Sequence, residues 1–212
     1  MLSVYRQPYV VKLYYLDPVY VTTAANMMPI EAQQDDQQLL IAFRDEATRE
    51  KAFTLLIKKY QERLYWHIRR MVTEHEDTND ILQNVFIKVW KNLLIFREES
   101  NLYTWLYRIA TNETLTWIDQ QKKRTAFSLS DHESALADKL VAQKGFDPNK
   151  LEWRLQQAIQ ALPDKQRIVF NLRYYDEMPY EEMAKVLDTS VGALKASYHH
   201  AVKKVEAFIK ND

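Results

Sequence analysis

Apolar residues recur every three or four positions through most of the chain, which is the spacing of amphipathic helices. The first such stretch extends from about Asp36 to Met71 and predicts two helices. The second starts with helix-capping side chains at residues 77 to 80 and continues to Leu93. A third helix fits residues 102 to 121, after a polar break. The pattern therefore predicts a unit of packed helices in this half of the chain.

The periodicity disappears between residues 122 and 150, where Ser, Asp, Lys and His accumulate around Gly145 and the pair Asp147-Pro148. This composition is typical of a flexible linker. Fully extended, the segment would be at most roughly 95 Å long, whereas two turns of a DNA duplex measure about 70 Å. Modules at its two ends could therefore contact two sites on one face of DNA.

Residues 151 to 212 predict a helix-turn-helix unit. A helix ending near Leu162 is followed by a second that starts at Pro163, and two further helices flank a short break at residues 188 to 192, where Ser190 can cap the last helix. The outward face of the last helix carries Lys195, His199 and Lys203, which could enter a major groove. A helical hairpin with merely solvated lysines is the alternative. The fold class expected for the whole chain is all-α, with two helical domains.

An N-terminal extension is expected at residues 1 to 30, and its residues 1 to 28 are rich in Tyr and Val, without the charged start and apolar core of a signal peptide. Met27 and Met28 stand just before the first helical pattern. We hypothesise that this stretch is dispensable and reflects a misplaced translation start, and an ordinary edge strand is the alternative.

The composition excludes several kinds of site and limits the classes of function that the chain can have. The chain has no cysteine, so disulfides and thiolate metal sites are excluded, and no apolar run approaches the roughly 20 residues of a membrane span. A cytoplasmic protein is expected. The net charge of zero predicts weak intrinsic affinity for DNA, although residues 190 to 210 carry four lysines and one glutamate.

No catalytic motif is present in the sequence, neither a Gly-rich phosphate loop nor a His-Glu-x-x-His pattern. His199 and His200 are adjacent, and neighbours on a helix point about 100° apart, so they would chelate a metal poorly. We therefore expect a protein that is not an enzyme, with no cofactor and no metal.

Several motifs carry a family resemblance. Residues 77 to 90 (DTNDILQNVFIKVW), the pair Phe96-Arg97 and residues 103 to 112 (YTWLYRIATN) resemble conserved region 2 of extracytoplasmic-function (ECF) RNA polymerase sigma factors. The pair Leu162-Pro163, residues 180 to 184 (YEEMA) and Val191-Gly192 resemble region 4.

The resemblance implies a region 2 domain at residues 31 to 121, a linker at 122 to 150 and a region 4 domain at 151 to 212. It also implies binding to bacterial core RNA polymerase, recognition and melting of promoter DNA, and transcription initiation. An anti-sigma factor is an implied partner. Neither a small-molecule substrate nor direct membrane insertion is expected.

Carried over by position, the resemblance assigns three groups of site residues. Core-polymerase binding is assigned to Asp80, Gln83, Asn84, Phe86 and Trp90. Contact with the minus-ten DNA is assigned to Phe96, Arg97, Ser100, Asn101, Tyr103, Arg108 and Asn112. Contact with the minus-thirty-five DNA is assigned to Ser190, Lys195, Ser197, His199, His200 and Lys203. Phe86 and Trp90 could equally be core residues.

The chain departs from the family at several of these positions. Asn84 replaces a frequent acidic residue, Glu98 replaces a frequent glycine and Leu102 replaces a common aromatic. Residues 195 to 200 (KASYHH) lack the arginines that would bind guanine in a bidentate manner. The promoter sequence is therefore not predictable from the family.

Two other classes of function remain open at this point. One is a two-module regulator that binds DNA alone, and the other is an adaptor or anti-sigma antagonist that binds only proteins. Binding to promoter DNA with and without polymerase separates all three classes.

The start-site hypothesis has a direct test. Mass spectrometry of the protein purified from its native host should give an N-terminal peptide that starts at or near Met27 or Met28. A native protein that begins at Met1 would refute it.

Overall fold

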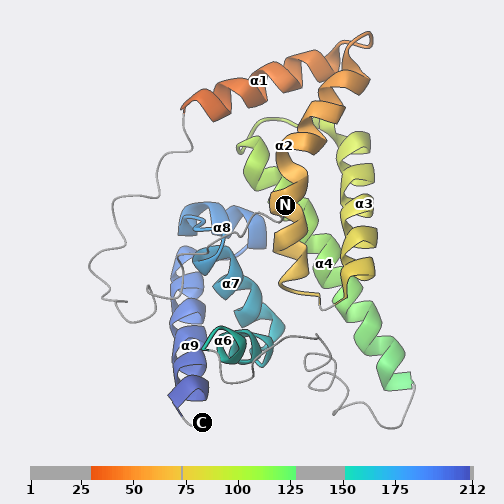
Figure 1. The fold of residues 1–212 in the computed structure, drawn as a ribbon. Helices are drawn as coiled ribbons and strands as arrows, with labels where there is room; N and C mark the ends of the chain where they lie inside the picture. Colours follow the sequence, from red (N-terminus) through yellow and green to blue (C-terminus); the bar gives the residue numbers. More distant parts are fainter. Residues whose placement is uncertain (1–29, 73, 128–150, 211–212) are drawn as a thin grey trace, which may run out of the picture.

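The computed structural model describes residues 30 to 72, 74 to 127 and 151 to 210, and every regular element in these ranges is a helix (Figure 1). The all-α prediction is confirmed. The predicted N-terminal extension, except Ile30, and most of the predicted linker lie outside the described residues.

The first unit contains α1 (Ile30–Arg44), α2 (Arg49–Arg69), α3 (His75–Asn92), the 3-10 turn η3 (Leu93–Ile95) and α4 (Leu102–Phe127). The predicted cap at residues 77 to 80 was wrong, because α3 begins at His75. Thr78 instead donates its hydroxyl to the Glu74 carbonyl, 2.7 Å away, inside the first turn. Glu76 and Asp77 lie in that turn, where negative charge is favourable to the helix dipole.

Helix α4 also continues six residues past its predicted end at residue 121. The added turns belong to the segment predicted as linker. Lys122 forms an ion pair there with Asp164 of α7, and Arg124 lies in the last turn, where positive charge favours the helix C-terminus. These charges favour the added turns, although the apolar periodicity has ended.

The second unit contains α6 (Leu151–Gln160), α7 (Asp164–Tyr174), α8 (Tyr180–Leu187) and α9 (Val191–Lys210). Helix α8 ends at Leu187, and the next residue, Asp188, adopts a left-handed conformation with φ 49°. The Ser190 hydroxyl accepts a hydrogen bond from the Ala193 amide at 3.2 Å, which caps α9 as its residue type predicted. The helix-turn-helix spacing is therefore present.

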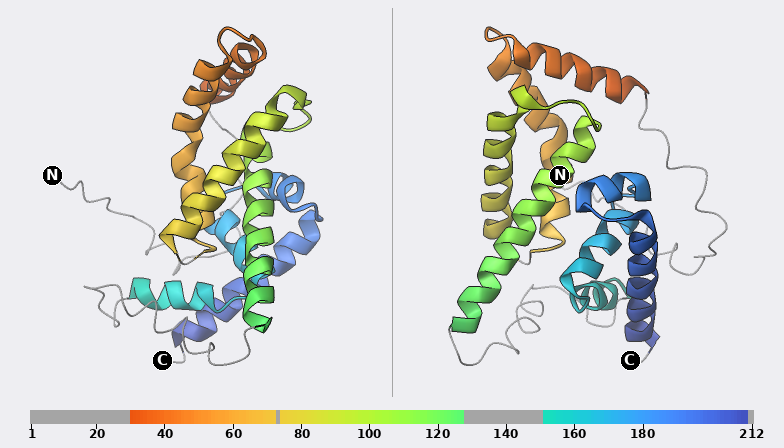
Figure 2. Two further views of the ribbon diagram at one scale, coloured as in Figure 1. Left: turned by 90° about the vertical axis from the view of Figure 1, so that its right-hand side faces the viewer. Right: turned by 180° about the vertical axis from the view of Figure 1, so that it is seen from behind.

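Figure 2 shows the two units side by side, and one apolar cluster contains buried residues from both. Helix α4 contacts α2 and α3 of the first unit and α8 of the second unit. Completely buried side chains in this core include Leu64, Leu106 and Tyr107 from the first unit and Leu172 and Met183 from the second. A smaller cluster between α6, α7 and α9 completes the second unit. Folding thus brings residues far apart in the sequence, such as Leu64 and Leu172, into one apolar core.

Burial of α2 gives a stability prediction. Leu64 is fully buried, whereas Leu55 on the same helix is 47% exposed. Leu64→Ala should lower the free energy of unfolding by about 2–5 kcal/mol, because it leaves a cavity. Leu55→Ala should change it by less than about 0.5 kcal/mol. Urea titrations followed by far-UV circular dichroism measure both, and equal losses would contradict this packing.

Candidate functional site

The exposed face of α3 combines polar and apolar side chains. Asp80, Gln83 and Asn84 are exposed in its first half. Further along lie Ile87, which is 44% exposed, and, in η3, Leu94, which is 47% exposed. Helical spacing places these residues on one side of α3 and the turn that follows it. Large exposed apolar groups among amides are typical of a protein-binding surface.

Phe86 and Trp90 serve partly as core residues. The Trp90 ring meets Phe43 at 5.3 Å and Phe53 at 4.9 Å between centroids, both edge to face. Phe86 contacts Phe53 in the same way at 6.4 Å. Trp90 nevertheless remains 38% exposed. Its ring therefore joins α1 and α2 to α3 and also contributes to the exposed face.

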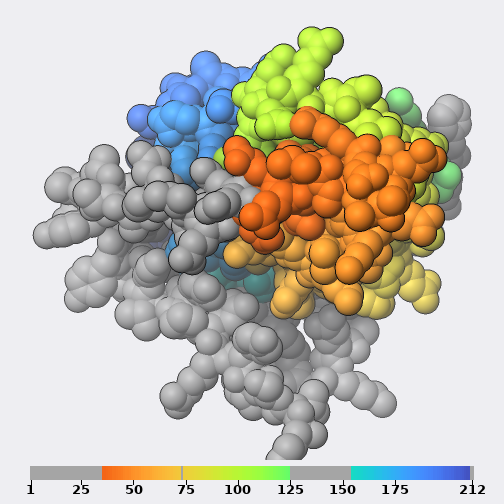
Figure 3. All heavy atoms as spheres, turned by 90° about the horizontal axis from the view of Figure 1, so that it is seen from above, coloured from red at the N-terminus to blue at the C-terminus, as the bar shows by residue number. Residues whose placement is uncertain are grey.

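The segment between η3 and α4, residues 96 to 101, belongs to the yellow-green region that lies between the orange α1 and the blue second unit in Figure 3. Phe96 is buried and its ring packs on Trp105 at 4.9 Å. Arg97 points into solvent, with 84% of its side chain exposed. Glu98 has a positive φ of 59° and forms an ion pair with Arg44 of α1 at 2.7 Å. Phe96 thus anchors a segment whose charged residues are exposed.

The Asn101 side chain defines the start of α4. Its oxygen accepts a hydrogen bond from the Thr104 amide at 2.7 Å, which is the geometry of a helix N-cap. Its amide group donates to Glu182 of α8 at 3.1 Å. The Thr104 hydroxyl donates to the other oxygen of Glu182, also at 3.1 Å. One carboxylate from the second unit is therefore held by two side chains at the first turn of α4.

An open cleft of about 770 Å³ lies beside this contact. Its walls carry the cations Lys88, Arg97, Arg108 and Lys185. The remaining lining residues are the aromatic pair Phe96 and Trp105, the acidic residues Glu99 and Asp188, and Asn92, Ile95, Ser100, Thr104, Ile109 and Ala184. Stacking rings with surrounding cations are the chemistry that binds single-stranded nucleic acid. Helix α8 of the second unit supplies one wall.

The remaining residues assigned to minus-ten DNA lie elsewhere. Tyr103 is buried and its ring packs on Tyr107 at 4.4 Å. Burial, with the nearby Asp176 carboxylate, raises the pKa of the Tyr103 phenol far above its ordinary value, so the phenol stays protonated. Asn112 is exposed on α4 and is not among the residues that line the cleft. The structure therefore brings together only part of the predicted group.

Helix α9 presents the third predicted group. Lys195, His199, His200 and Lys203 are exposed, and Ser197 is half-buried. The Lys195 ammonium lies 5.7 Å from the Tyr180 ring centroid, and the Arg173 guanidinium lies 5.0 Å from the same ring. Burial raises the pKa of the Tyr180 phenol, which stays neutral between these cations. The exposed face of α9 is thus positively charged and adjoins the start of α8.

The sequence interpretation missed two kinds of residue. Ile87 and Leu94 extend the α3 face, and their spacing from Asn84 and Trp90 could have revealed them. Glu182 could not have been found in this way, because its partners lie 78 and 81 positions away.

Within the described ranges, no group of three or more His, Asp or Glu side chains is placed to bind a metal ion. None of the described helices has the length and hydropathy to cross a membrane.

Comparison with known families gives two matches. Residues 56–124 match the family described as Sigma-70 region 2. Residues 152–205 match Sigma-70, region 4. The first includes most of α2 together with α3 and α4, and the second includes the helix-turn-helix. The fold and both matched regions therefore define a sigma factor.

Two relatives that match over most of their length identify the family within the sigma factors. The chain is 31% identical to the RNA polymerase sigma-H factor of Pseudomonas aeruginosa over 184 residues, which cover 82% of this chain and 93% of the relative. It is 30% identical to the ECF RNA polymerase sigma-E factor of Escherichia coli K12, with 82% and 95% covered. The chain belongs to the ECF sigma factor family. Its function is to bind core RNA polymerase and direct promoter recognition, DNA melting and transcription initiation.

Two solved structures share the fold. One is CnrH in complex with the cytosolic domain of CnrY, with a TM-score of 0.60, 21% identity, and 84% of this chain and 99% of that chain covered. The other is the sigma factor RpoE of Bartonella quintana in complex with the anti-sigma factor NepR, with a TM-score of 0.60, 21% identity, and 76% and 99% covered. The helical arrangement is therefore one that sigma factors adopt.

The backbone at Glu98 gives a prediction for this site. A left-handed conformation costs most residues about 1–2 kcal/mol, but not glycine. The Arg44 ion pair is about half exposed and offsets only a little of that cost. Glu98→Gly should therefore leave the free energy of unfolding unchanged or raise it by up to about 1 kcal/mol.

The neighbouring Glu99 provides the control, since it is exposed and its φ is not positive. Glu99→Gly should lower the free energy of unfolding by about 0.5–1 kcal/mol through backbone entropy. Chemical denaturation of both variants checks the difference. Equal destabilisation by the two substitutions would contradict the strained conformation at residue 98.

Proposed function

We propose that the described surfaces divide the work of initiation among three groups of residues. The α3 face binds core polymerase, the cleft beside residues 96 to 101 captures melted minus-ten DNA, and α9 reads the minus-thirty-five element. The observation that carries the proposal is the cleft, which joins the Phe96 and Trp105 rings to four cationic side chains. We keep the domain bounds 31 to 121, 122 to 150 and 151 to 212 as part of this proposal.

On the α3 face, Asp80, Gln83 and Asn84 supply polar contacts to core polymerase, and Ile87 and Trp90 supply apolar area. Exposed apolar side chains at the centre of such a face contribute most of the affinity when they are desolvated. Phe86 acts indirectly, because it supports Phe53 and hence the position of Trp90.

At the cleft, Arg97 and Arg108 attract the phosphates of the displaced strand, and Ser100 and Asn101 offer hydrogen bonds to an unstacked base. Phe96 forms the apolar wall. Tyr103 acts by positioning, since its buried ring supports the first turn of α4. Asn112 extends the contact along α4 toward the flanking DNA.

On α9, Lys195 and Lys203 neutralise phosphates, while Ser197, His199 and His200 contact the major groove. Ser190 caps the helix and so orients its N-terminal turn toward the DNA. Few cations are involved, so affinity without polymerase should be low and should fall only modestly with added salt, because few counterions are released.

The protein acts in the cytoplasm as a subunit and not as an enzyme, because the polymerase supplies the catalysis. An anti-sigma factor is a fitting regulator. Of the two structures that share the fold, one contains the sigma factor RpoE bound to the anti-sigma factor NepR, and the other contains CnrH bound to the cytosolic domain of CnrY.

Reconstitution tests the proposal. The protein is mixed with bacterial core polymerase and genomic promoter fragments from its host, and permanganate detects unpaired thymines. We expect melting only when both proteins are present. Binding of DNA without core, to which core adds nothing, would favour a stand-alone regulator instead.

Matched variants locate the surfaces. Ile87→Ser should weaken binding to core by about 1–3 kcal/mol without loss of stability, because it removes exposed apolar area. Lys195→Ala should weaken promoter binding by the holoenzyme, whereas Lys165→Ala, which is also exposed but lies on α7 outside the proposed groove face, should not. Fluorescence anisotropy measures both, and equal effects of the two lysine variants would contradict the assignment on α9.

A further inference from the structure

Ile95, the last residue of η3, is an apolar side chain that is largely unpacked. Among the exposed large apolar side chains of the described residues it is the most exposed, at 72%, and it is the one that lines the cleft. An isolated exposed isoleucine needs no explanation by itself. Its position is informative, because the cleft is lined by cations that can hold phosphates. An apolar group at such a surface is suited to contact the bases and not the backbone of DNA.

Buried residues on both sides hold Ile95 in place. Leu93, which precedes it in η3, is 2% exposed, and Phe96, the next residue, is 9% exposed. The Phe96 amide donates to the Leu93 carbonyl at 3.3 Å and so closes the 3-10 turn that contains Ile95. The side chain of Ile95 is itself stiff, because it branches at Cβ. Ile95 would therefore lose little conformational freedom when it contacts a ligand.

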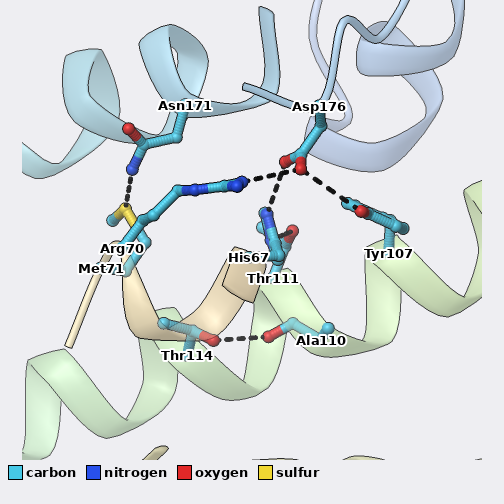
Figure 4. Close-up of polar contacts among 9 residues, drawn as sticks. All are labelled: His67, Arg70, Met71, Tyr107, Ala110, Thr111, Thr114, Asn171 and Asp176. Atoms are coloured by element: carbon cyan, nitrogen blue, oxygen red, sulfur yellow. Dashed lines mark hydrogen bonds and ion pairs between the residues drawn. The ribbon is translucent and has the colours of Figure 1, made fainter. Parts of the chain in front are cut away.

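The Phe96 ring, which anchors this turn, packs on a helix that is itself fixed. Its contact is with Trp105 of α4, at 4.9 Å between ring centroids. Further along α4, the Thr111 hydroxyl lies 3.0 Å from Nε2 of His67, a fully buried residue of α2 (Figure 4). Trp105 and Thr111 lie on different faces of α4, so the helix is supported on both. The support of Ile95 thus extends through α4 into the core.

Three cations from the first unit line the same cleft as Ile95. Arg97 follows it by two residues and has 84% of its side chain exposed. Lys88 of α3 has 54% of its side chain exposed, and Arg108 of α4 is also exposed. These groups can hold the phosphates of a strand that crosses the cleft. The bases of that strand would then face the apolar residues of the cleft, of which Ile95 is the most exposed.

We propose that Ile95 is a wedge at the edge of the melted minus-ten segment. Its side chain enters an opened base step and takes the place of the base that has left the stack. The last closed base pair thereby keeps an apolar neighbour. Isoleucine is among the residues that proteins insert between base steps to unstack them. The proposal rests on the assignment of the cleft to minus-ten DNA under the proposed function, and it adds a residue that acts on the opening step.

A wedge differs from other DNA contacts because it needs a closed base pair to rest against. A forked DNA offers this pair, since it is duplex up to the minus-ten segment and single-stranded beyond it. An oligonucleotide of the same single strand alone does not offer it. Both DNAs are made from a promoter that the full-length protein melts together with core polymerase. Fluorescence anisotropy of the labelled DNAs then gives the affinity of the holoenzyme for each.

Three variants are compared with the parent. Ile95→Ser removes the apolar contact, and Ile95→Leu retains it. Ile41→Ser is the matched control, because Ile41 is 66% exposed on α1 and is not among the residues that line the cleft. Ile95→Ser should weaken binding to the forked DNA about tenfold, which corresponds to about 1.4 kcal/mol, and should change binding to the single strand by less than about twofold. Ile95→Leu and Ile41→Ser should bind both DNAs as the parent does.

Several outcomes would overturn the wedge. Equal losses of Ile95→Ser on both DNAs would make Ile95 a contact to the unpaired strand, and unchanged binding to the forked DNA would remove it from the opening step. Weaker binding of Ile95→Ser to core polymerase without DNA would assign the residue to a protein interface. A parent that melts no promoter with core would refute the proposed function and the wedge together. A parent that melts its promoter, with Ile95→Ser behaving alike, would overturn the wedge alone.

Discussion

The Asn101 side chain connects the main features of this structure. Its oxygen caps α4 through the Thr104 amide, and its amide group donates to Glu182 of the second unit. The cap sets where α4 begins and therefore where the segment after η3 must turn. Helix α4 in turn contacts α2, α3 and α8, so its start determines how both units meet. One polar side chain thus links local helix formation, tertiary packing and the proposed DNA site.

The interface between the units differs in character from either core. Apolar residues such as Met178 and Met183 contribute to it, but Asp176, Glu182 and Asn171 are also buried or half-buried there. Charged and amide groups gain water when such an interface opens, whereas apolar groups lose burial. A mixed interface is therefore suited to two states of similar free energy. A sigma factor needs units that can separate, because they must reach two promoter elements once it is bound to polymerase.

The local backbone geometry explains one departure from the family pattern. Glu98 replaces a frequent glycine at a position where φ is 59°, and Arg44 of α1 accompanies it. The ion pair orients a side chain whose backbone would suit glycine better. It also ties α1 to the segment that contacts the proposed minus-ten DNA. Compared with glycine, Glu98 therefore adds some backbone strain but gains a contact between two elements.

The apolar periodicity by itself determined the helices, because burial of one face every 3.6 residues is a local property of the chain. It was sufficient for α2, α7 and α9, and residue types alone identified the Ser190 cap. The motifs identified the family before any contact was known. Only the tertiary structure decided that α4 extends to Phe127, that Trp90 is shared between core and surface, and that Glu182 meets Asn101. Each of these depends on charges or surfaces brought together from distant positions, and a pattern of neighbouring residues contains no information on that pairing.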